Sequence, residues 1–170
     1  MNEPLFECTY TDTEEILRES YSYVRGKRDV EIGWALVFAA GMIFLLQIWI
    51  RQFFWVAVAG VLLCDGIYKL CLPAINARSV MEQIRRANNG TIPSANIVVS
   101  DKITHYYKQD ISVMLFVDLR FAYFLKRCIV LVSEETYLTF DRAGFTKGSA
   151  EEFETFIREK YPHVKIINKE

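Results

Sequence analysis

The hydrophobic positions of this chain are concentrated in one long block near its start. Residues 32–50 read IGWALVFAAGMIFLLQIWI, nineteen positions without a charged side chain. At about 1.5 Å per helical residue this segment extends roughly 28 Å, close to the thickness of the hydrocarbon core of a bilayer. A buried helix of a soluble domain rarely lacks any charge over this length, so the pattern predicts a transmembrane helix.

A second apolar segment, residues 53–72, follows after two polar residues. It contains Asp65 and Lys69, and each of these would cost about 2.5–3.5 kcal/mol at the middle of a bilayer. Both lie in the latter half of the segment, where the cost falls and a lysine side chain can reach the interface. We therefore expect residues 32–72 to form a transmembrane hairpin of two helices, 32–50 and 53–72.

Basic residues are distributed unevenly around the two predicted spans. Only Arg51 lies in the short connection, whereas seven basic residues lie close to the other ends of the two spans: Arg25, Lys27, Arg28, Lys69, Arg78, Arg85 and Arg86. The positive-inside rule then predicts a multi-pass protein with both termini in the cytosol. The long charged stretch before the first apolar run is atypical of a cleaved signal peptide.

The segment before the hairpin, residues 1–31, predicts a short cytosolic strand and a helix. Leu5–Tyr10 alternates in polarity, which is typical of a strand. Thr11 followed by Glu14 has the spacing of a capping box, so we expect the helix to begin there.

The segment after the hairpin changes its period twice. Residues 73–91 predict a juxtamembrane helix that opens at Pro73 and stops at Gly90. Residues 92–170 predict a small cytosolic domain, because short runs rich in β-branched and aromatic residues alternate with polar breaks, as in an antiparallel meander. These runs are Asn96–Val99, Ile103–Lys108, Ser112–Val117, Phe121–Leu125, Cys128–Val132 and Tyr137–Phe140.

A final helix is predicted over residues 149–160. Ser149 and Glu152 form a second capping box at its start. Its apolar stripe is Phe153, Phe156 and Ile157, and Glu154 is expected on the exposed side. The predicted fold class is therefore an α+β membrane protein, with a two-helix hairpin and a small antiparallel sheet capped by a C-terminal helix.

The end of the predicted sheet carries a family resemblance. The run FDRAGF at residues 140–145, followed by GSAEEF at residues 148–153, resembles the YcxB-like bacterial membrane proteins, in which a strand ends in a P-K-x-x-F corner before an EEF helix. Here Asp141 and Arg142 stand where Pro and Lys are usual. The resemblance implies a cytosolic domain similar to a pleckstrin-homology (PH) fold and a place in the bacterial cytoplasmic membrane. It implies no established activity.

No residue constellation predicts catalysis, a metal site or a cofactor. His105 and His163 lie outside any metal-binding or catalytic motif, and no GxSxG, Walker A or GxGxxG sequence occurs. Four scattered cysteines fit reduced thiols better than a disulfide framework. A net charge of −1 argues against a nucleic-acid binder, since binding phosphate requires a basic surface. We expect a protein that is not an enzyme.

Asp65 is the most unusual residue of the second span. An acid within a span is a candidate functional residue, for example on a proton path or at the docking site of a partner helix. The alternative is an ion pair with Lys69, which lies four positions later in the favoured orientation. Two spans are too few to enclose a path without oligomers, which favours the ion pair.

Other membrane-related positions carry weaker expectations. Arg78, Arg85 and Arg86 are candidates for contact with anionic lipid, alongside their role in topology. Small residues spaced four apart, Ala35 with Ala39 and Gly60 with Cys64, either seal the hairpin or join copies into a homo-oligomer.

These observations favour a non-enzymatic function. The first expectation is a bacterial inner-membrane protein that presents a cytosolic PH-like domain, which binds a protein partner or senses a signal. The alternative is a membrane-embedded immunity or accessory subunit that contacts a toxin or transporter through its hairpin. Membrane lipids and one unidentified protein are the expected partners, with no nucleic acid.

Overall fold

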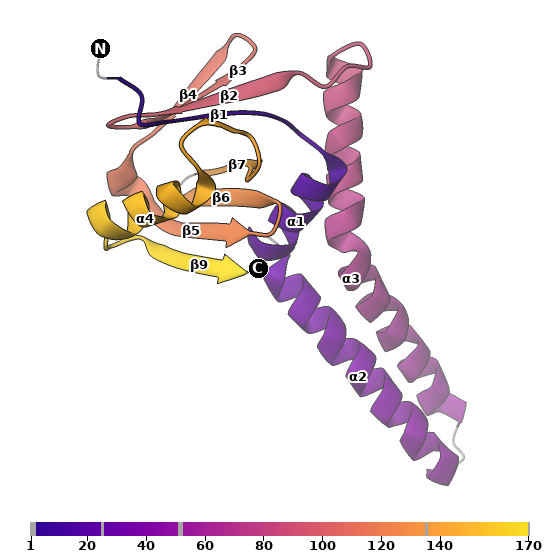
Figure 1. The fold of residues 1–170 in the computed structure, drawn as a ribbon. Helices are drawn as coiled ribbons and strands as arrows, with labels where there is room; N and C mark the ends of the chain where they lie inside the picture. The colour runs from indigo at the N-terminus through magenta and orange to yellow at the C-terminus, as the bar shows by residue number, and fades with distance from the viewer. Residues whose placement is uncertain (1–2, 25, 51–52, 135, 170) are drawn as a thin grey trace. The chain divides into compact units, whose positions relative to one another are not determined.

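The computed structural model describes residues 3–24, 26–50, 53–134 and 136–169. Within these residues the chain is α+β, with four α-helices, nine strands and one short 3-10 turn (Figure 1). It divides into two compact units, and each is described by itself. Residues 1–20 and 80–170 form the sheet unit, and residues 21–79 form the helical unit.

The sheet unit contains a five-stranded antiparallel sheet of order β4-β3-β2-β1-β8. Its strands are β1 (Phe6–Thr11), β2 (Ser94–Val99), β3 (Ile103–Tyr107), β4 (Asp110–Met114) and β8 (Phe145–Lys147). Alternate residues of β1 are buried, as its side-chain period of two requires. The predicted strands Asn96–Val99 and Ile103–Lys108 are confirmed as β2 and β3. The predicted Ser112–Val117 overlaps β4 but continues past its end at Met114, and β8 was not expected.

β1 joins the two ends of the chain into one unit. Cys8 of β1 pairs with Ile97 of β2, although the whole helical unit lies between them in the sequence. The division that set residues 1–31 apart from residues 92–170 was therefore wrong for this strand. An isolated strand cannot bury its apolar positions, and β1 does so only between β2 and β8.

A second sheet has the order β7-β6-β5-β9. Its strands are β5 (Leu119–Leu125), β6 (Cys128–Ser133), β7 (Tyr137–Asp141) and β9 (Lys165–Lys169). The antiparallel meander is confirmed for the first three, but β9 lies parallel to β5, so the sheet is mixed. The parallel direction arises because the chain passes through α4 (Ala150–Lys160) before it reaches the sheet edge.

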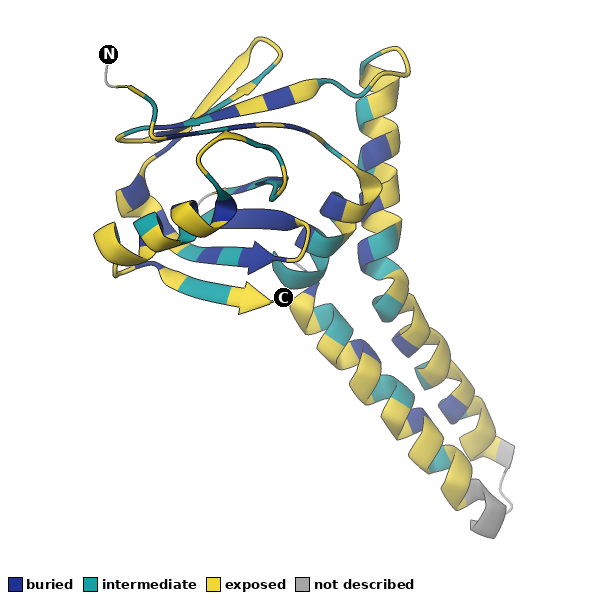
Figure 2. Ribbon diagram, viewed as in Figure 1, coloured by how far each residue is buried: buried dark blue, intermediate teal, exposed yellow. Residues whose placement is uncertain are grey.

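α4 closes the core of the sheet unit with aromatic side chains. Phe153 and Ile157 are fully buried and Phe156 is partly buried, which confirms the predicted stripe (Figure 2). The Ser149 hydroxyl accepts a hydrogen bond from the Glu152 backbone N–H at 3.2 Å, which confirms the predicted N-cap.

α1 (Glu14–Val24) is capped by a different residue from the one predicted. The Thr13 hydroxyl accepts a hydrogen bond from the Ile16 backbone N–H at 3.2 Å. Thr11, the predicted cap, is the last residue of β1 and pairs with Ser94. Pairing in the sheet therefore displaced the cap by two residues.

The helical unit contains α2 (Lys27–Ile50) and most of α3 (Phe53–Ala87). Both helices are long and apolar enough to cross a membrane. α3 continues through Pro73, so the separate juxtamembrane helix predicted to open there was wrong. Proline has no backbone N–H, so α3 lacks one hydrogen bond at Pro73. Pro73 is nevertheless buried, and its ring packs close to Gly26, just before α2.

Candidate functional site in the helical hairpin

Small residues spaced seven apart form the contact between α2 and α3. Gly33 and Ala40 are the buried positions of the described part of α2, and Ala59 and Gly66 are buried on the facing stripe of α3. A seven-residue repeat keeps one stripe turned towards a partner helix, and small side chains let two backbones approach. The expected small-residue pairs at Ala35–Ala39 and Gly60–Cys64 are instead exposed.

The two helices lie close together at Gly33 and Gly66. A Cβ atom added to Gly66 would lie 2.9 Å from Val37 Cγ2 and 3.0 Å from the Gly33 carbonyl oxygen. A Cβ atom on Gly33 would lie 3.0 Å from the Gly66 carbonyl oxygen. Because the oxygens belong to the backbone of the facing helix, a larger residue at either position requires the two helices to move apart by a few tenths of an ångström. A search for small residues at heptad spacing finds Gly33 with Ala40 and Ala59 with Gly66, but it also finds the exposed pair Ala57 and Cys64, so it does not select this stripe alone.

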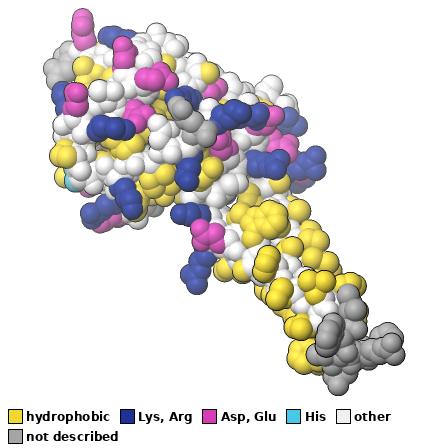
Figure 3. Space-filling view, turned by 60° about the horizontal axis from the view of Figure 1, so that its bottom comes forward, with side chains coloured by type: hydrophobic (Ala, Val, Ile, Leu, Met, Phe, Trp, Pro, Cys, Tyr) yellow, Lys and Arg dark blue, Asp and Glu magenta, His cyan; other side chains and the backbone are white. Residues whose placement is uncertain are grey.

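The remaining surface of the hairpin is apolar and exposed. On the face drawn in Figure 3, hydrophobic side chains cover much of the described part of the hairpin. In the most apolar 18-residue stretch of each helix, only 11% of the residues are buried. Trp34 and Phe38 are 63% and 75% exposed. A core helix of a soluble protein would bury most of these side chains, so this surface requires an apolar environment.

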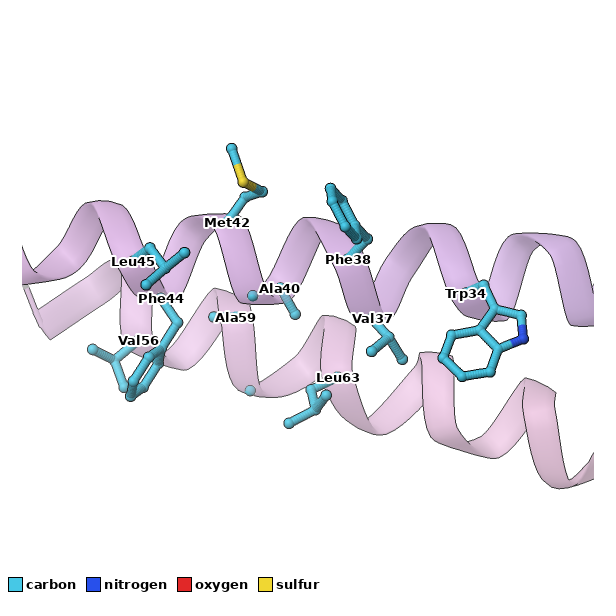
Figure 4. Close-up of a pocket in the computed structure, with 12 residues that line it drawn as sticks. Trp34, Val37, Phe38, Ala40, Met42, Phe44, Leu45, Val56, Ala59 and Leu63 are labelled. Atoms are coloured by element: carbon cyan, nitrogen blue, oxygen red, sulfur yellow. The ribbon is translucent and has the colours of Figure 1, made fainter.

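One face of the hairpin is hollowed into a groove of about 770 Å³. Aromatic and aliphatic side chains of α2 rim it, among them Trp34, Phe38 and Met42, and α3 contributes Leu63 (Figure 4). Gly60 leaves space here, since nothing lies within 4 Å of a Cβ atom added to it. The groove has almost no polar lining, so it can hold an acyl chain or an apolar helix and has no means of binding a polar ligand.

The predicted ion pair of the second span differs from the observed one. Lys69 Nζ lies 3.8 Å from Asp29 Oδ1, which joins the middle of α3 to the first turn of α2. Both side chains of the expected pair are described, and no ion pair joins Lys69 to Asp65. Asp65 is exposed and lies four residues, about 6 Å, before Lys69 on α3. Asp29, the missed partner, lies three residues before the first apolar run.

The three arginines proposed for lipid contact lie on the latter part of α3, and all are exposed. Arg86 donates a hydrogen bond to Glu82 at 3.1 Å, one helical turn earlier. The carbonyl of Arg85 accepts hydrogen bonds from Asn88 and Gly90, which end the helix. Exposure leaves these side chains accessible to anionic groups.

A polar cleft of about 560 Å³ lies in the sheet unit beside α1. Lys126, Arg127 and Arg142 line it, but Arg127 pairs with Glu15 and Arg142 pairs with Glu151. Glu19, on α1, accepts hydrogen bonds from the backbone N–H groups of Lys126 and Arg127 at 3.1 and 3.0 Å. These contacts fasten α1 to the turn between β5 and β6, which is a structural role.

A second polar cluster surrounds His105 on the inner face of β3. Its two ring nitrogens lie 3.2 Å from the Tyr10 hydroxyl and 3.3 Å from the Ser112 hydroxyl. Burial lowers the pKa of His105 below its usual value, and burial raises the pKa of Asp12 and Tyr10. The cluster therefore holds a neutral histidine at neutral pH.

The lowered pKa of His105 makes the sheet unit sensitive to acid. The unfolded chain takes up the histidine proton near pH 6.5, whereas the folded chain resists it, so stability should fall as the pH drops below about 6.5. Asp12 has the opposite effect on stability, nearer pH 4. Burial raises its pKa in the folded chain, so the folded chain takes up this proton more readily than the unfolded chain and gains stability as the pH falls. We expect the unfolding temperature of the His105→Gln variant to fall less between pH 7.5 and 5.5 than that of the wild type. An equal fall in both proteins would contradict this assignment.

The described residues hold no cluster of three potential metal ligands. Cys8 and Cys128 are buried, and burial raises the pKa of the Cys8 thiol to about 12 and also raises that of Cys128. Both thiols are therefore inert as nucleophiles at neutral pH.

Comparison with known proteins adds no relative. No family model, no curated protein and no solved structure matches this chain.

Proposed function

We propose that this protein is anchored in a membrane by α2 and α3 and presents its sheet unit to a protein partner or signal in the cytosol. The observation that carries the proposal is the exposed apolar surface of both helices. Only 11% of the residues in the most apolar stretch of each helix are buried. In water this surface would cost about 25 cal/mol for each Å² left uncovered, so a bilayer is the environment that fits it. The charged pair of Lys69 and Asp29 marks the end of the hairpin nearest the interface.

The architecture of the sheet unit supports the PH-like part of the proposal. Two sheets enclose one core, and a C-terminal helix packs its aromatic face, Phe153 and Phe156, against that core. The resemblance to the YcxB-like bacterial proteins implies the same kind of domain, and it is our reason for proposing the bacterial inner membrane as the location of the anchor. Small sheets of this kind bind partners by strand addition or in a groove, and this is an analogy at the level of fold.

The orientation can be tested by thiol labelling. Cys8 and Cys128 are buried and cannot report on it, so we choose exposed Gln109 in the turn after β3 and position 52, which lies outside the described residues. In a background of Cys64→Ala and Cys71→Ala, Gln52→Cys should react with an impermeant maleimide in intact spheroplasts. Gln109→Cys should react only after lysis, because the basic residues retain that side in the cytosol. Labelling of Gln109→Cys before lysis would reverse the orientation.

A second candidate function rests on the hairpin itself. The apolar groove and the exposed carboxylate of Asp65 would suit an immunity or accessory subunit that binds a helix of a toxin or transporter in the membrane. In this second function the partner covers Phe38 and Leu63 of the groove, and the sheet unit does not make the main contact.

Exchanging the hairpin separates the two functions. Residues 32–72 are replaced by an unrelated two-span hairpin of equal length, and partner capture from native membranes is compared with that of the wild type. Under the first function capture persists, because the sheet unit is unchanged. Loss of capture with normal membrane insertion would support the second function and refute the first.

Asp65 has its own test within this comparison. The double variant Asp65→Leu, Lys69→Leu should insert and capture the partner normally, since an apolar pair is tolerated at least as well as charges in a span. Normal insertion with lost capture would make Asp65 a docking residue of the hairpin.

A further inference from the structure

The free edges of the two sheets differ in how they are protected. The β9 edge carries Lys165 and Lys169, and β8 is only three residues long and ends at Lys147. β7 lies beside α1, whose Ser20 hydroxyl is 2.8 Å from the Thr139 hydroxyl. Short strands, lysines and covering helices are the usual protection against pairing with another chain. Within the described residues, the β4 edge has none of these.

β4 also presents apolar side chains at its edge. Ile111 and Val113 are 64% and 50% exposed on the outer face of the sheet, beside Tyr106 of β3. The chain carries no charge from Ile111 to Val117, and Leu115 and Val117 are exposed as well. An apolar and uncovered edge strand whose single charge is at its first residue, Asp110, favours the addition of another strand.

The register of β4 shows which backbone groups are available. A two-residue turn joins Tyr107 to Asp110, so these two residues form the closing hydrogen-bonded pair of the hairpin. Hydrogen-bonded and non-hydrogen-bonded pairs then alternate, so Ser112 bonds inward to β3. Ile111 and Val113 direct their N–H and C=O groups away from β3, towards the free edge.

We propose that β4 of one chain pairs antiparallel with β4 of a second copy, about a two-fold axis at Ser112. Ser112 is the middle residue of the strand, so this register pairs all five of its residues. Ile111 of one copy then lies opposite Val113 of the other, and both exchange backbone hydrogen bonds. The result is one continuous sheet across two copies, with an apolar stripe on its outer face.

The charges that flank β4 favour a second copy over an unrelated strand. Lys108 lies in the turn before the strand, and Asp118 follows it in the short turn Phe116–Asp118. Antiparallel pairing brings the lysine end of each copy beside the aspartate end of the other. Asp110 of one copy lies opposite Met114 of the other, so the two Asp110 carboxylates are about 14 Å apart along the strand, beyond the Debye length of about 8 Å.

Cysteine cross-linking tests this register. At Ser112 the two-fold axis creates a non-hydrogen-bonded pair with a Cα separation of about 4.5 Å, within the range of a disulfide. In full-length protein with Cys64→Ala and Cys71→Ala, Ser112→Cys should cross-link under mild oxidation in cell lysate. The expected product has twice the mass of the 19.8-kDa chain. A product of any other mass would mean that a different strand occupies this edge and would overturn the proposal.

Neighbouring positions supply the control for the register. Two Ile111→Cys copies would be about 8 Å apart in Cα position, too far for a disulfide, so this variant alone should not cross-link. A mixture of Ile111→Cys and Val113→Cys chains should cross-link to each other. Cross-linking of Ile111→Cys alone as strong as that of Ser112→Cys would refute the two-fold axis.

A charge on the edge tests the pairing without cysteine. Val113→Lys adds a lysine to each copy at the paired edge, so the purified full-length chain should become monomeric in mild detergent by light scattering. Thr9→Lys is the matched control, because Thr9 is exposed on the same face of the sheet but on β1. It should remain dimeric. A monomeric wild type, or equal masses for both variants, would overturn the proposal.

Discussion

Replacing Phe153 with alanine should destabilise the sheet unit by about 3–5 kcal/mol, because it removes the side chain at the centre of the aromatic core. Phe153 is fully buried, and its ring lies 5.3 Å from that of Phe6 and 6.0–6.1 Å from those of Phe140 and Phe145. These neighbours come from β1, β7 and β8, so the truncation leaves a cavity shared by both sheets. Stabilities of small domains are about 5–15 kcal/mol, so the loss is a large fraction of the total.

Denaturant unfolding of the full-length protein in detergent, followed by near-UV circular dichroism, measures this effect. Glu159→Ala is the matched control, since Glu159 is exposed on the same helix, and should change stability by less than about 0.5 kcal/mol. Glu154, which the sequence analysis placed on the exposed side, is unsuitable: its side chain is 14% exposed and bonds Arg158 and Asn168. Equal effects of Phe153→Ala and Glu159→Ala would refute the assigned packing of α4.

Gly66→Val should separate α2 from α3. The first added atom would lie 3.0 Å from the Gly33 carbonyl and 3.1 Å from the Val37 backbone nitrogen, so the helices must move apart. Overpacking of this kind costs about 1–3 kcal/mol, and the displaced helices also lose their buried contact at Ala40 and Ala59. We expect a lower unfolding temperature in detergent and faster proteolysis of the hairpin.

Gly60→Val is the control for this variant. Gly60 is on the same helix and is exposed, and nothing lies within 4 Å of a Cβ atom added there. The same gain in volume should therefore leave the unfolding temperature unchanged. A loss of stability at Gly60 equal to that at Gly66 would mean that the intrinsic helix propensity of the residue, and not the helix contact, is responsible.

Local patterns predicted most of the elements but few of their partners. The Ser149 cap and the Phe153 stripe depend on residues within two helical turns, so spacing alone was sufficient. The pairing of β1 with β2 spans the whole hairpin, and the parallel direction of β9 depends on the path through α4. No local pattern encodes such contacts, because they are set by which apolar faces remain to be covered.

In the hairpin, too, the sequence predicted the helices but not the residues through which they contact each other. Apolar runs predicted both helices, but a helix that is hydrophobic all round gives no moment to identify its contact face. The sequence analysis therefore selected small residues four apart, whereas the observed stripe repeats every seven, at Gly33 and Ala40. It paired Lys69 with Asp65 on its own helix, although Asp29 becomes adjacent once the hairpin folds. Pro73 was read as a helix start because its support near Gly26 lies across the unit.

Alkaline extraction of membranes tests the central claim, that α2 and α3 cross a bilayer, most directly. The full-length chain is expressed in bacteria, and the membrane fraction is washed with carbonate at about pH 11, which removes peripheral proteins while spanning helices remain. The account predicts that the wild type stays in the pellet and is released only by detergent, as the exposed surface around Phe38 requires. Recovery of the folded chain in the carbonate supernatant, or in the soluble fraction before the wash, would contradict it.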